Sequence, residues 1–329
     1  MTVNIGIVGC GYMGGTHAKI LAADPRVKIV AVADGIGARA DALALSLSNK
    51  DTRAFTSASD LLSAGVDAVY VTTPNTLHTE TVMMALAAGV HVFSEKPMAT
   101  TLSEARQVYE ATKQARGRYQ VGHNRRFAPV YQYFKQAMAQ GLTVTSAHLK
   151  MNRGELQNPP WVGNTQITGG FLYETTLHLL DMARWLIGDV LQVEARGNRR
   201  AYQETDNFSM LLAFAGGQFA TFTSCAHTTW AFPFESVELY GAHQQIVTQE
   251  MEKVTHSAGL GQPVLTHDYF QLAIPQKWGY VEEDRLFVDS VLQGAPTAVT
   301  AEDGYRAIEL VEAIYRSVAN DGERVSLPL

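Results

Sequence analysis

A short apolar stretch that runs into a glycine-rich turn is the feature that most constrains the fold of this chain. Residues 3–8 are mostly apolar, and three glycines then follow in the spacing G-x-G-x-x-G. The first glycine permits a tight turn from strand to helix, the second lets a pyrophosphate approach the backbone, and the third lets the helix pack against the strand. The residues expected to contact a dinucleotide at this turn are Gly9, Gly11, Tyr12, Met13 and Gly14.

A second apolar run ends at an acidic residue, as a dinucleotide-binding unit requires. The run spans residues 27–33, and Asp34 follows it twenty residues after Gly14. A carboxylate there accepts hydrogen bonds from the adenosine ribose hydroxyls and repels a 2′-phosphate, so we expect NAD rather than NADP. Arg39 is assigned to the solvated face of the next helix. The alternative interpretation is a glycine-rich turn in some other α/β fold.

The first 122 residues alternate strand and helix signals at short spacing. Apolar runs of this kind, linked by helices, predict a parallel sheet covered on both faces. The expected strands are 4–8, 28–33, 68–72, 90–94 and 118–121, and the expected helices include 76–88 and 102–116. The fold class is therefore α/β, with residues 1–122 forming a Rossmann dinucleotide-binding domain.

After residue 126 the pattern changes to that of an α+β domain, which we assign to residues 123–329. The Gly216-Gly217 pair between two apolar runs predicts a hairpin within a large, open and mainly antiparallel sheet. Strands are expected to dominate from there to the last helix. Expected helices cover 129–140, 172–187 and 301–319, and expected strands cover 144–153, 192–198, 207–214, 218–226 and 236–240.

Composition and charge exclude several function classes. The net charge of −6 gives no reason to expect nucleic acid or a membrane as a partner. Two cysteines, Cys10 and Cys225, are too few for a disulfide framework, and no signal peptide is recognised, so a cytoplasmic location is expected. The histidine and cysteine spacings show no metal signature. Cys225 and His227 share a face of one expected strand, but two ligands are too few for a zinc site.

Two further segments carry residues suited to chemistry. Glu95-Lys96-Pro97 ends an apolar strand at the edge of the sheet where ligands bind in open α/β folds. In the second segment, Glu174 and His178 lie four residues apart on an expected helix and so project from one face. A neutral imidazole is a suitable base for a hydroxyl proton.

In order and spacing, these motifs resemble the family of glucose–fructose oxidoreductase, inositol dehydrogenase and the rhizopine catabolism protein MocA, over nearly the full length. The resemblance rests on the glycine loop, Thr73-Pro74-Asn75 with His78, Glu95-Lys96-Pro97, the Gly-Gly…Glu174…His178 helix and the segment 294–304. It implies an NAD(P)-dependent oxidoreductase that transfers hydride between the nicotinamide and a secondary hydroxyl of a sugar, cyclitol or related polyol. Glu174 stands where the family usually has Asp, and Thr168 replaces one glycine of its triple-glycine segment.

The resemblance also implies roles for individual residues. Lys96 would polarise the oxygen, His178 would be the general acid/base, and Glu174 would orient its neighbours or bind substrate. The Lys96-Pro97 bond is expected to be cis, as is frequent in relatives. Besides the glycine loop and Asp34, the expected cofactor contacts are Thr73, Asn75, His78, Glu95 and Lys96. Assembly as a homodimer or homotetramer through the second domain's sheet is implied as well.

Substrate recognition is expected from the second domain, although the identity of the substrate does not follow from the sequence. A tryptophan face suits the apolar side of a sugar ring, and amides suit its hydroxyls. The expected substrate contacts are Asn124, Arg153, Trp161, Glu174 and His178, with Asn158 and Asn164 in the same polar loop. Two other functions stay open: a glycosidase that uses NAD for transient oxidation, and a non-catalytic regulator that senses a dinucleotide.

Overall fold

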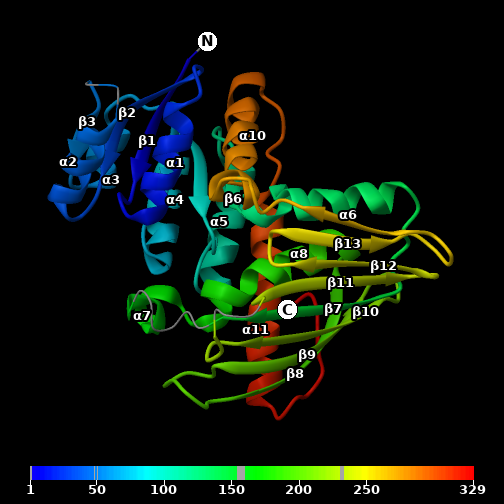
Figure 1. Cartoon of the computed structure of the whole chain (residues 1–329). Coiled ribbons are helices and arrows are strands. Elements are labelled where there is room, and N and C mark those ends of the chain that lie inside the picture. Colours follow the sequence, from blue (N-terminus) through cyan, green and yellow to red (C-terminus); the bar gives the residue numbers. More distant parts are fainter. Residues whose placement is uncertain (1, 48, 50, 154–159, 230–232) are drawn as a thin grey trace. The chain divides into compact units, whose positions relative to one another are not determined.

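The chain folds into two compact units. The first comprises Met1–His123 and Tyr280–Tyr305, and the second comprises Asn124–Gly279 and Arg306–Leu329. The computed structural model, shown in Figure 1, describes the chain except for residues 1, 48, 50, 154–159 and 230–232. The first crossing between the units lies between His123 and Asn124. The division expected from the sequence, at residues 122 and 123, does not include the return of residues 280–305 to the first unit.

The first unit is built on a six-stranded parallel sheet with the strand order β3-β2-β1-β4-β5-β6. The strands are β1 (Val3–Val8), β2 (Val27–Ala33), β3 (Arg53–Phe55), β4 (Ala68–Val71), β5 (His91–Glu95) and β6 (Tyr119–Gly122). The chain order reverses between β1 and β4, and ligands bind at such a point beyond the carboxyl ends of the strands. This sheet confirms the expected Rossmann architecture.

Helices connect these strands, and a late helix joins them. They are α1 (Tyr12–Ala22), α2 (Gly37–Ser46), α3 (Ala58–Leu62), the short η1 (Asn75–Leu77), α4 (His78–Ala87), α5 (Leu102–Gln114) and α10 (Tyr280–Gln293). Helix α5 has Thr101 as its N-cap, because the Thr101 hydroxyl accepts the Glu104 N–H and donates to the Glu104 carboxylate. The core includes Ile5, Ile7, Leu21, Tyr70, Phe93 and, from α10, Phe287.

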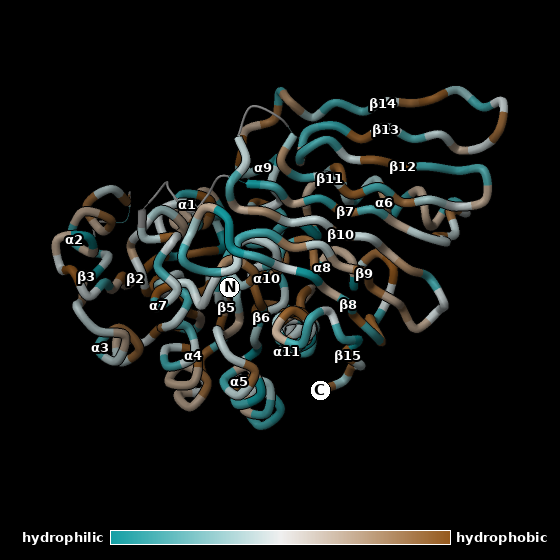
Figure 2. The backbone as a smooth tube through the Cα atoms, turned by 90° about the horizontal axis from the view of Figure 1, so that it is seen from below, coloured by the Kyte–Doolittle hydropathy of each residue, from teal (hydrophilic) through white to brown (hydrophobic). Residues whose placement is uncertain are grey.

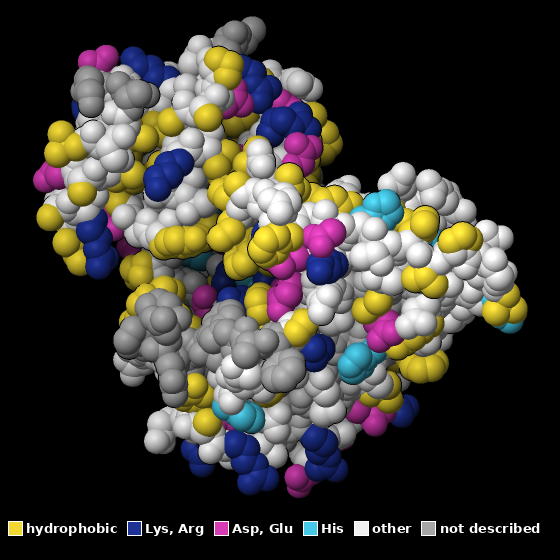
Figure 3. All heavy atoms as spheres, in the orientation of Figure 1, with side chains coloured by type: hydrophobic (Ala, Val, Ile, Leu, Met, Phe, Trp, Pro, Cys, Tyr) yellow, Lys and Arg dark blue, Asp and Glu magenta, His cyan; other side chains and the backbone are white. Residues whose placement is uncertain are grey.

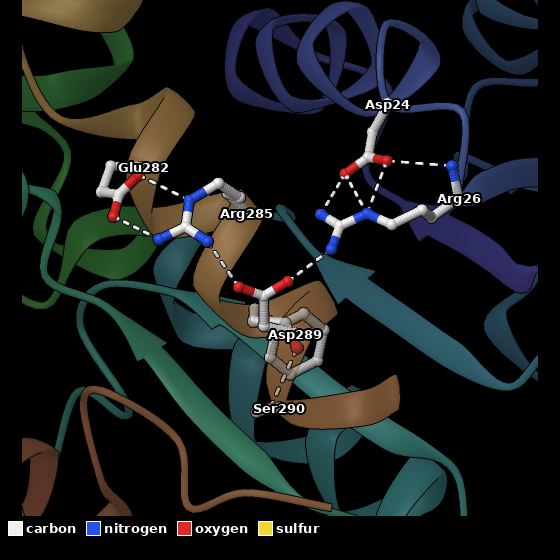
Figure 4. Close-up of polar contacts among 7 residues, drawn as sticks. Asp24, Arg26, Glu282, Arg285, Asp289 and Ser290 are labelled. Atoms are coloured by element: carbon white, nitrogen blue, oxygen red, sulfur yellow. Dashed lines mark hydrogen bonds and ion pairs between the residues drawn. The ribbon is translucent and has the colours of Figure 1, made fainter. Parts of the chain in front are cut away.

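Helix α10 corrects the expectation that strands dominate up to residue 301. Its buried face carries Glu283 and Asp284 beside Phe287 and Val288. Acidic residues at core positions break the apolar period by which a helix is recognised. Asp289 of this helix accepts hydrogen bonds from Arg26, just before β2, and from Arg285, as Figure 4 shows.

The second unit contains a nine-stranded sheet in the order β14-β13-β12-β11-β7-β10-β9-β8-β15. Its strands are β7 (Ser146–Asn152), β8 (Val190–Asn198), β9 (Asn207–Phe214), β10 (Phe219–Cys225), β11 (Glu235–Gly241), β12 (Gln244–Gln249), β13 (Lys253–Ser257), β14 (Val264–Asp268) and β15 (Val325–Ser326). They lie side by side in Figure 2. All neighbours pair antiparallel except β7 with β10. The β9–β10 hairpin predicted from Gly216-Gly217 is confirmed.

The three helices expected in the second unit are present, together with four short helical segments that were not expected. In chain order they are η2 (Asn124–Phe127), α6 (Pro129–Ala139), η4 (Pro160–Gly163), α7 (Thr165–Thr168), the π-helical η5 (Leu172–Thr176), α8 (Leu177–Ile187), α9 (Ile274–Lys277) and α11 (Ala301–Ala319). The four unexpected segments are η2, η4, α7 and α9. Helix α11 matches its expected range, and its first five residues are counted with the first unit.

Side chains alternate between the two faces of the large sheet. On β9, Phe208, Met210 and Leu212 are buried, whereas Ser209 and Leu211 are exposed. This alternation is typical of an antiparallel sheet with one packed face.

Figure 3 shows apolar side chains scattered among polar ones over the part of the surface that carries β12 and β13. Within the described ranges, no helix has the length and hydropathy needed to cross a membrane.

Candidate functional site

The glycine loop after β1 has the geometry that its sequence predicts. Gly9 has a φ of +100°, and an added Cβ would lie 2.5 Å from the backbone of Thr72. At Gly14 an added Cβ would lie 2.0 Å from the carbonyl oxygen of Gly9, so this position admits no side chain. Gly11 differs, because no described atom lies within 4 Å of its hypothetical Cβ. Two glycines therefore close the turn, and the third leaves open space beside the backbone.

Helix α1 starts directly at this open position. Gly11 is its N-cap residue, and no side chain caps the helix there. Tyr12 is 81% exposed and Met13 is half-buried. Unpaired N–H groups at a helix N-terminus, together with the partial positive charge of the helix dipole, suit an anion. The loop thus fits the pyrophosphate of a dinucleotide.

Asp34, just past the end of β2, contacts the same loop. Its Oδ2 accepts the N–H of Cys10 at 2.9 Å, and its Oδ1 accepts the N–H of Ile36 at 2.9 Å. An ionised carboxylate has about four acceptor positions, so two backbone bonds leave capacity for ribose hydroxyls. Burial and the charge of Asp34 raise the pKa of the Cys10 thiol to about 12, which keeps it protonated and unreactive.

The loop after β4 is tied to the segment after β5. His78 is fully buried, and its ring nitrogens lie 2.8 Å from the carbonyl oxygens of Thr73 and Pro97. Asn75 is buried, and Thr73 lies in the loop itself. His78 therefore holds two loops together at the carboxyl edge of the sheet, and both of its ring nitrogens are engaged in doing so.

Lys96 follows β5 at the same edge of the sheet. The Lys96–Pro97 bond is cis, which confirms the expectation. The carboxylate of Glu95 accepts the backbone N–H of Lys96 at 3.1 Å. Glu95 is buried and contacts His17 of α1, which in turn contacts Asp284 of α10. His17 and Asp284 were not predicted as site residues, because they lie 267 residues apart and neither belongs to a recognised motif.

In the second unit, Glu174 and His178 come from a helix with an irregular start. Glu174 lies in the π-helical stretch η5, and His178 lies in the first turn of α8. His178 is 8% exposed and Glu174 is half-buried. A π-helical turn inside an α-helix is rare and occurs frequently at functional sites. The predicted continuous α-helix is thus interrupted where the acidic residue lies.

The start of this helix is held by residues from elsewhere in the second unit. Gly169 and Gly170 both have positive φ, and Glu204 accepts the N–H of Phe171 at 2.7 Å. An added Cβ at Gly170 would lie 2.9 Å from the Tyr315 hydroxyl. Burial raises the pKa of Glu204, and the Phe171 N–H opposes that shift. The two glycines are therefore required by backbone conformation and close approach.

Two arginines that directly follow Asn124 form buried ion pairs. Arg126 donates to both oxygens of Asp181, at 2.8 and 2.6 Å, and Arg125 donates to Glu235. Asn124 is 1% exposed, and its side-chain amide donates to the carbonyl oxygen of Trp278 at 2.8 Å. These contacts show structural roles for Asp181 and both arginines, and they engage the amide of Asn124.

The polar loop before the helix is described in part. Trp161 is 46% exposed in η4, and Asn164 caps α7 by accepting the Gln166 N–H. The guanidinium of Arg153 lies 4.7 Å from the ring centroid of Phe234. Asn158 lies outside the described residues. Trp161 thus presents an exposed indole to a ligand, and Asn164 is exposed as well.

The candidate residues form two groups, one in each unit. In the first unit, the glycine loop, Asp34, Thr73, Asn75 and Lys96 all follow strands at the carboxyl edge of the parallel sheet. In the second unit, Glu174 and His178 lie on one helix. Among the residues that the structure describes, no three histidine, cysteine or acidic side chains are arranged to hold a metal ion.

Comparison with known families gives two matches along the chain. The description "oxidoreductase family, NAD-binding Rossmann fold" applies to residues 3–123. The description "oxidoreductase family, C-terminal alpha/beta domain" applies to residues 135–327. Together they cover both units except for short segments, and they agree with the two sheets described above.

Individual relatives are similar over nearly their whole length. Inositol 2-dehydrogenase of Rhizobium meliloti (strain 1021) is 28% identical over 97% of this chain and 98% of its own. Inositol 2-dehydrogenase of Paracoccus denitrificans (strain Pd 1222) is 31% identical over 100% of this chain and 98% of its own. Among solved structures, GenD2 from gentamicin A biosynthesis, in complex with NAD, is 27% identical with a TM-score of 0.86, over 100% of this chain and 97% of that one.

Proposed function

We propose, from the premise that this chain belongs to the oxidoreductase family with an NAD-binding Rossmann fold and a C-terminal alpha/beta domain, that it oxidises a secondary hydroxyl of a sugar, cyclitol or related polyol. The chain is accordingly an NAD-binding oxidoreductase. The observation that carries the proposal is the gathering of the glycine loop, Asp34 and Lys96 at one edge of the parallel sheet. This arrangement would offer a phosphate site, a ribose acceptor and a cation at one edge of the sheet.

The residues of the first unit fit NAD. The N-terminus of α1, with open space at Gly11, would hold the pyrophosphate. Asp34 would accept hydrogen bonds from the adenosine ribose, and its charge would disfavour the 2′-phosphate of NADP. NAD, when bound, supplies the carbon that accepts a hydride. The chain's own residues must therefore bind the alcohol, orient it and remove its proton.

The proton chemistry is assigned to two residues. His178 would take the hydroxyl proton as general base and return it in the reverse direction. Lys96 would donate a hydrogen bond to the same oxygen and stabilise the negative charge that develops on it. Glu174 would orient its neighbours or bind a second hydroxyl, since its longer side chain stands where the family usually has Asp.

The substrate class is supported by the relatives and by the polar loop. Two similar proteins are named inositol 2-dehydrogenase, so a cyclitol leads the candidates. Trp161 presents an exposed indole on which the apolar face of a ring could stack. Arg153 and Asn124 are further proposed contacts, and the engaged amide of Asn124 makes it the weaker of the two.

A screen of cyclitols and sugars with NAD and with NADP tests the proposal, by following the absorbance of the reduced cofactor. The expected result is stoichiometric NADH formation with at least one cyclitol or sugar. Release of a sugar from a glycoside without net NADH would instead indicate the glycosidase. Tight NAD binding with no turnover of any polyol, glycoside or oxidised polyol would indicate a regulator.

A further inference from the structure

Three buried side chains from distant parts of the first unit meet next to Lys96. They are His17 of α1, Glu95 at the end of β5 and Asp284 of α10. The Nδ1 of His17 lies 2.8 and 2.9 Å from the two carboxylate oxygens of Asp284, and its Nε2 lies 3.1 Å from Oε1 of Glu95. None of the three side chains is more than 9% exposed.

The geometry indicates a charged imidazole. Ionised carboxylate oxygens only accept hydrogen bonds, and both ring nitrogens donate only in the imidazolium form. Burial opposes that charge, but Asp284 and Glu95 outweigh it and raise the pKa of His17 well above its usual range. Burial would also raise the pKa of Glu95, yet the hydrogen bond and charge of His17, aided by Lys96, leave it lowered.

The surrounding groups preserve this state. Burial and the charge of Glu95 raise the pKa of Asp284, and the charge and hydrogen bond of His17 oppose that shift. Burial, with the charges of Asp284 and Glu283, raises the pKa of Tyr70 on β4 well above its usual range, which keeps that phenol neutral. His17 and Tyr70 therefore both keep their protons at neutral pH.

Glu95 transmits this arrangement to Lys96. One of its oxygens accepts from His17, and the other accepts the backbone N–H of Lys96 at 3.1 Å. His17 lies on α1, the helix that starts at the glycine loop. The orientation of the Glu95-Lys96-Pro97 segment therefore depends on contacts to α1 and α10.

We infer that His17 and Asp284 are positioning residues for Lys96, which act by fixing the Glu95 carboxylate. The inference rests on the proposed function, because it assigns Lys96 to the reacting oxygen. A buried ion cluster is a costly way to fill a core, and well-packed apolar residues often replace one without loss of stability. The His17 ring already lies among aromatic rings, 5.1 Å from Phe93 and 5.4 Å from Tyr70. If position 17 served only to fill the core, an apolar side chain would fill it equally well.

Two variants and a matched control test the inference in the full-length protein. His17→Gln and Asp284→Asn should each lower kcat roughly tenfold to a hundredfold, the cost of misplacing a reacting group by about an ångström. The KM for the polyol should change less than kcat. Ser94→Ala is the control. Ser94 lies on β5, as Glu95 does, and the substitution removes its buried hydrogen bond to Tyr119 (2.8 Å), which does not involve the Glu95 carboxylate. Its kcat should stay within twofold of wild type.

The pH profile separates positioning from simple loss of stability. In Asp284→Asn the imidazolium of His17 has lost an anionic partner, so its pKa should fall and its proton should leave as pH rises through neutrality. The variant should therefore lose kcat on the alkaline side at a pH where wild type and Ser94→Ala retain it. A folded Asp284→Asn enzyme with wild-type kcat and pH profile would overturn the inference.

Hydrogen exchange gives a readout that does not depend on turnover. The Lys96 amide should be protected in wild type and in Ser94→Ala, and it should exchange faster in His17→Gln and Asp284→Asn. If no polyol is oxidised by wild type while this pattern is found, the proposed function fails and the link from His17 to Lys96 stands. Equal protection in all four proteins removes the link, whatever the substrate proves to be.

Discussion

At the scale of single residues, Asp34 combines a structural contact with a proposed cofactor contact. Its carboxylate accepts the N–H groups of Cys10 and Ile36, and its charge would disfavour a 2′-phosphate. We expect Asp34→Ser to narrow the preference for NAD over NADP and to weaken NAD binding, because the glycine loop loses an acceptor. Dissociation constants for both cofactors check this. Asp34→Asn is the control, since it keeps an acceptor oxygen and removes the charge. A wild-type preference for NADP would contradict the assignment.

His178 is the residue whose loss should affect chemistry most. If it is the general base, His178→Ala should lower kcat by roughly two to four orders of magnitude. Binding of NAD should barely change, because the glycine loop and Asp34 belong to the first unit. Glu174→Gln should have a milder effect if the acid only orients its neighbours. Steady-state kinetics and cofactor titration check both variants, and near-normal turnover of His178→Ala would end this mechanism.

Glu250 gives the second unit a pH-dependent stability. Burial, with the charge of Glu235, raises the pKa of Glu250 to about 7 against the effect of its bond from the Phe234 N–H. The folded state therefore favours the protonated acid, and stability is lost as pH rises through that value. Glu250→Gln should match wild type at pH 4, below the ordinary pKa of 4.5, and be more stable at pH 8.5, by on the order of 1 kcal/mol. Denaturant unfolding at the two pH values checks this, and equal stabilities at pH 8.5 would contradict it.

At the scale of elements, two ion pairs of different burial should contribute very different amounts. Arg126 of η2 and Asp181 of α8 form a bidentate pair in which neither side chain is more than 6% exposed. Removing one partner of a buried pair costs about 3–5 kcal/mol, so Asp181→Asn should strongly lower the free energy of unfolding. Glu282→Gln, which breaks an exposed pair with Arg285 on α10, should cost at most about 1 kcal/mol. Similar losses in both variants would contradict this.

Elements with a regular apolar period were predictable from the sequence. The β9–β10 hairpin follows from Gly216-Gly217, and α11 follows from its helical period. Helix α10 escaped prediction because its buried face contains Glu283 and Asp284. The short β3 spans only three residues, too few to show a period. Local pattern therefore identifies elements that bury apolar side chains, and it fails where a charged partner distant in sequence pairs with a buried charge.

The candidate site shows the same division. The glycine loop, Asp34 and Lys96 could be found because each follows a strand in a motif of fixed spacing. His17 and Asp284 could not be found, since their contact joins residues 267 positions apart. The π-helical turn at Glu174 also gave no sequence signal, because the i, i+4 spacing of Glu174 and His178 is that of an ordinary helix.

At the scale of the whole molecule, neither unit is a continuous stretch of chain. The first unit is completed by residues 280–305, and the second by residues 306–329, which include β15 paired with β8. A fragment ending at residue 123 would lack Phe287 in its core and Asp284 beside His17. The two units therefore depend on the same late segment of the chain for their completion.

Assembly is the last property that the fold bears on, and we expect a homodimer or homotetramer through the large sheet. Leu211 and Phe219 are 42% and 55% exposed on its open face, where apolar side chains gain by being covered. Phe219→Arg should lower the mass measured by analytical ultracentrifugation, because a charge would then be buried in the interface. Leu45→Arg is the matched control, since Leu45 is an exposed apolar residue of α2 in the first unit. If wild type is a monomer, this assembly does not form. If Leu45→Arg dissociates the oligomer and Phe219→Arg does not, the contact does not involve the large sheet.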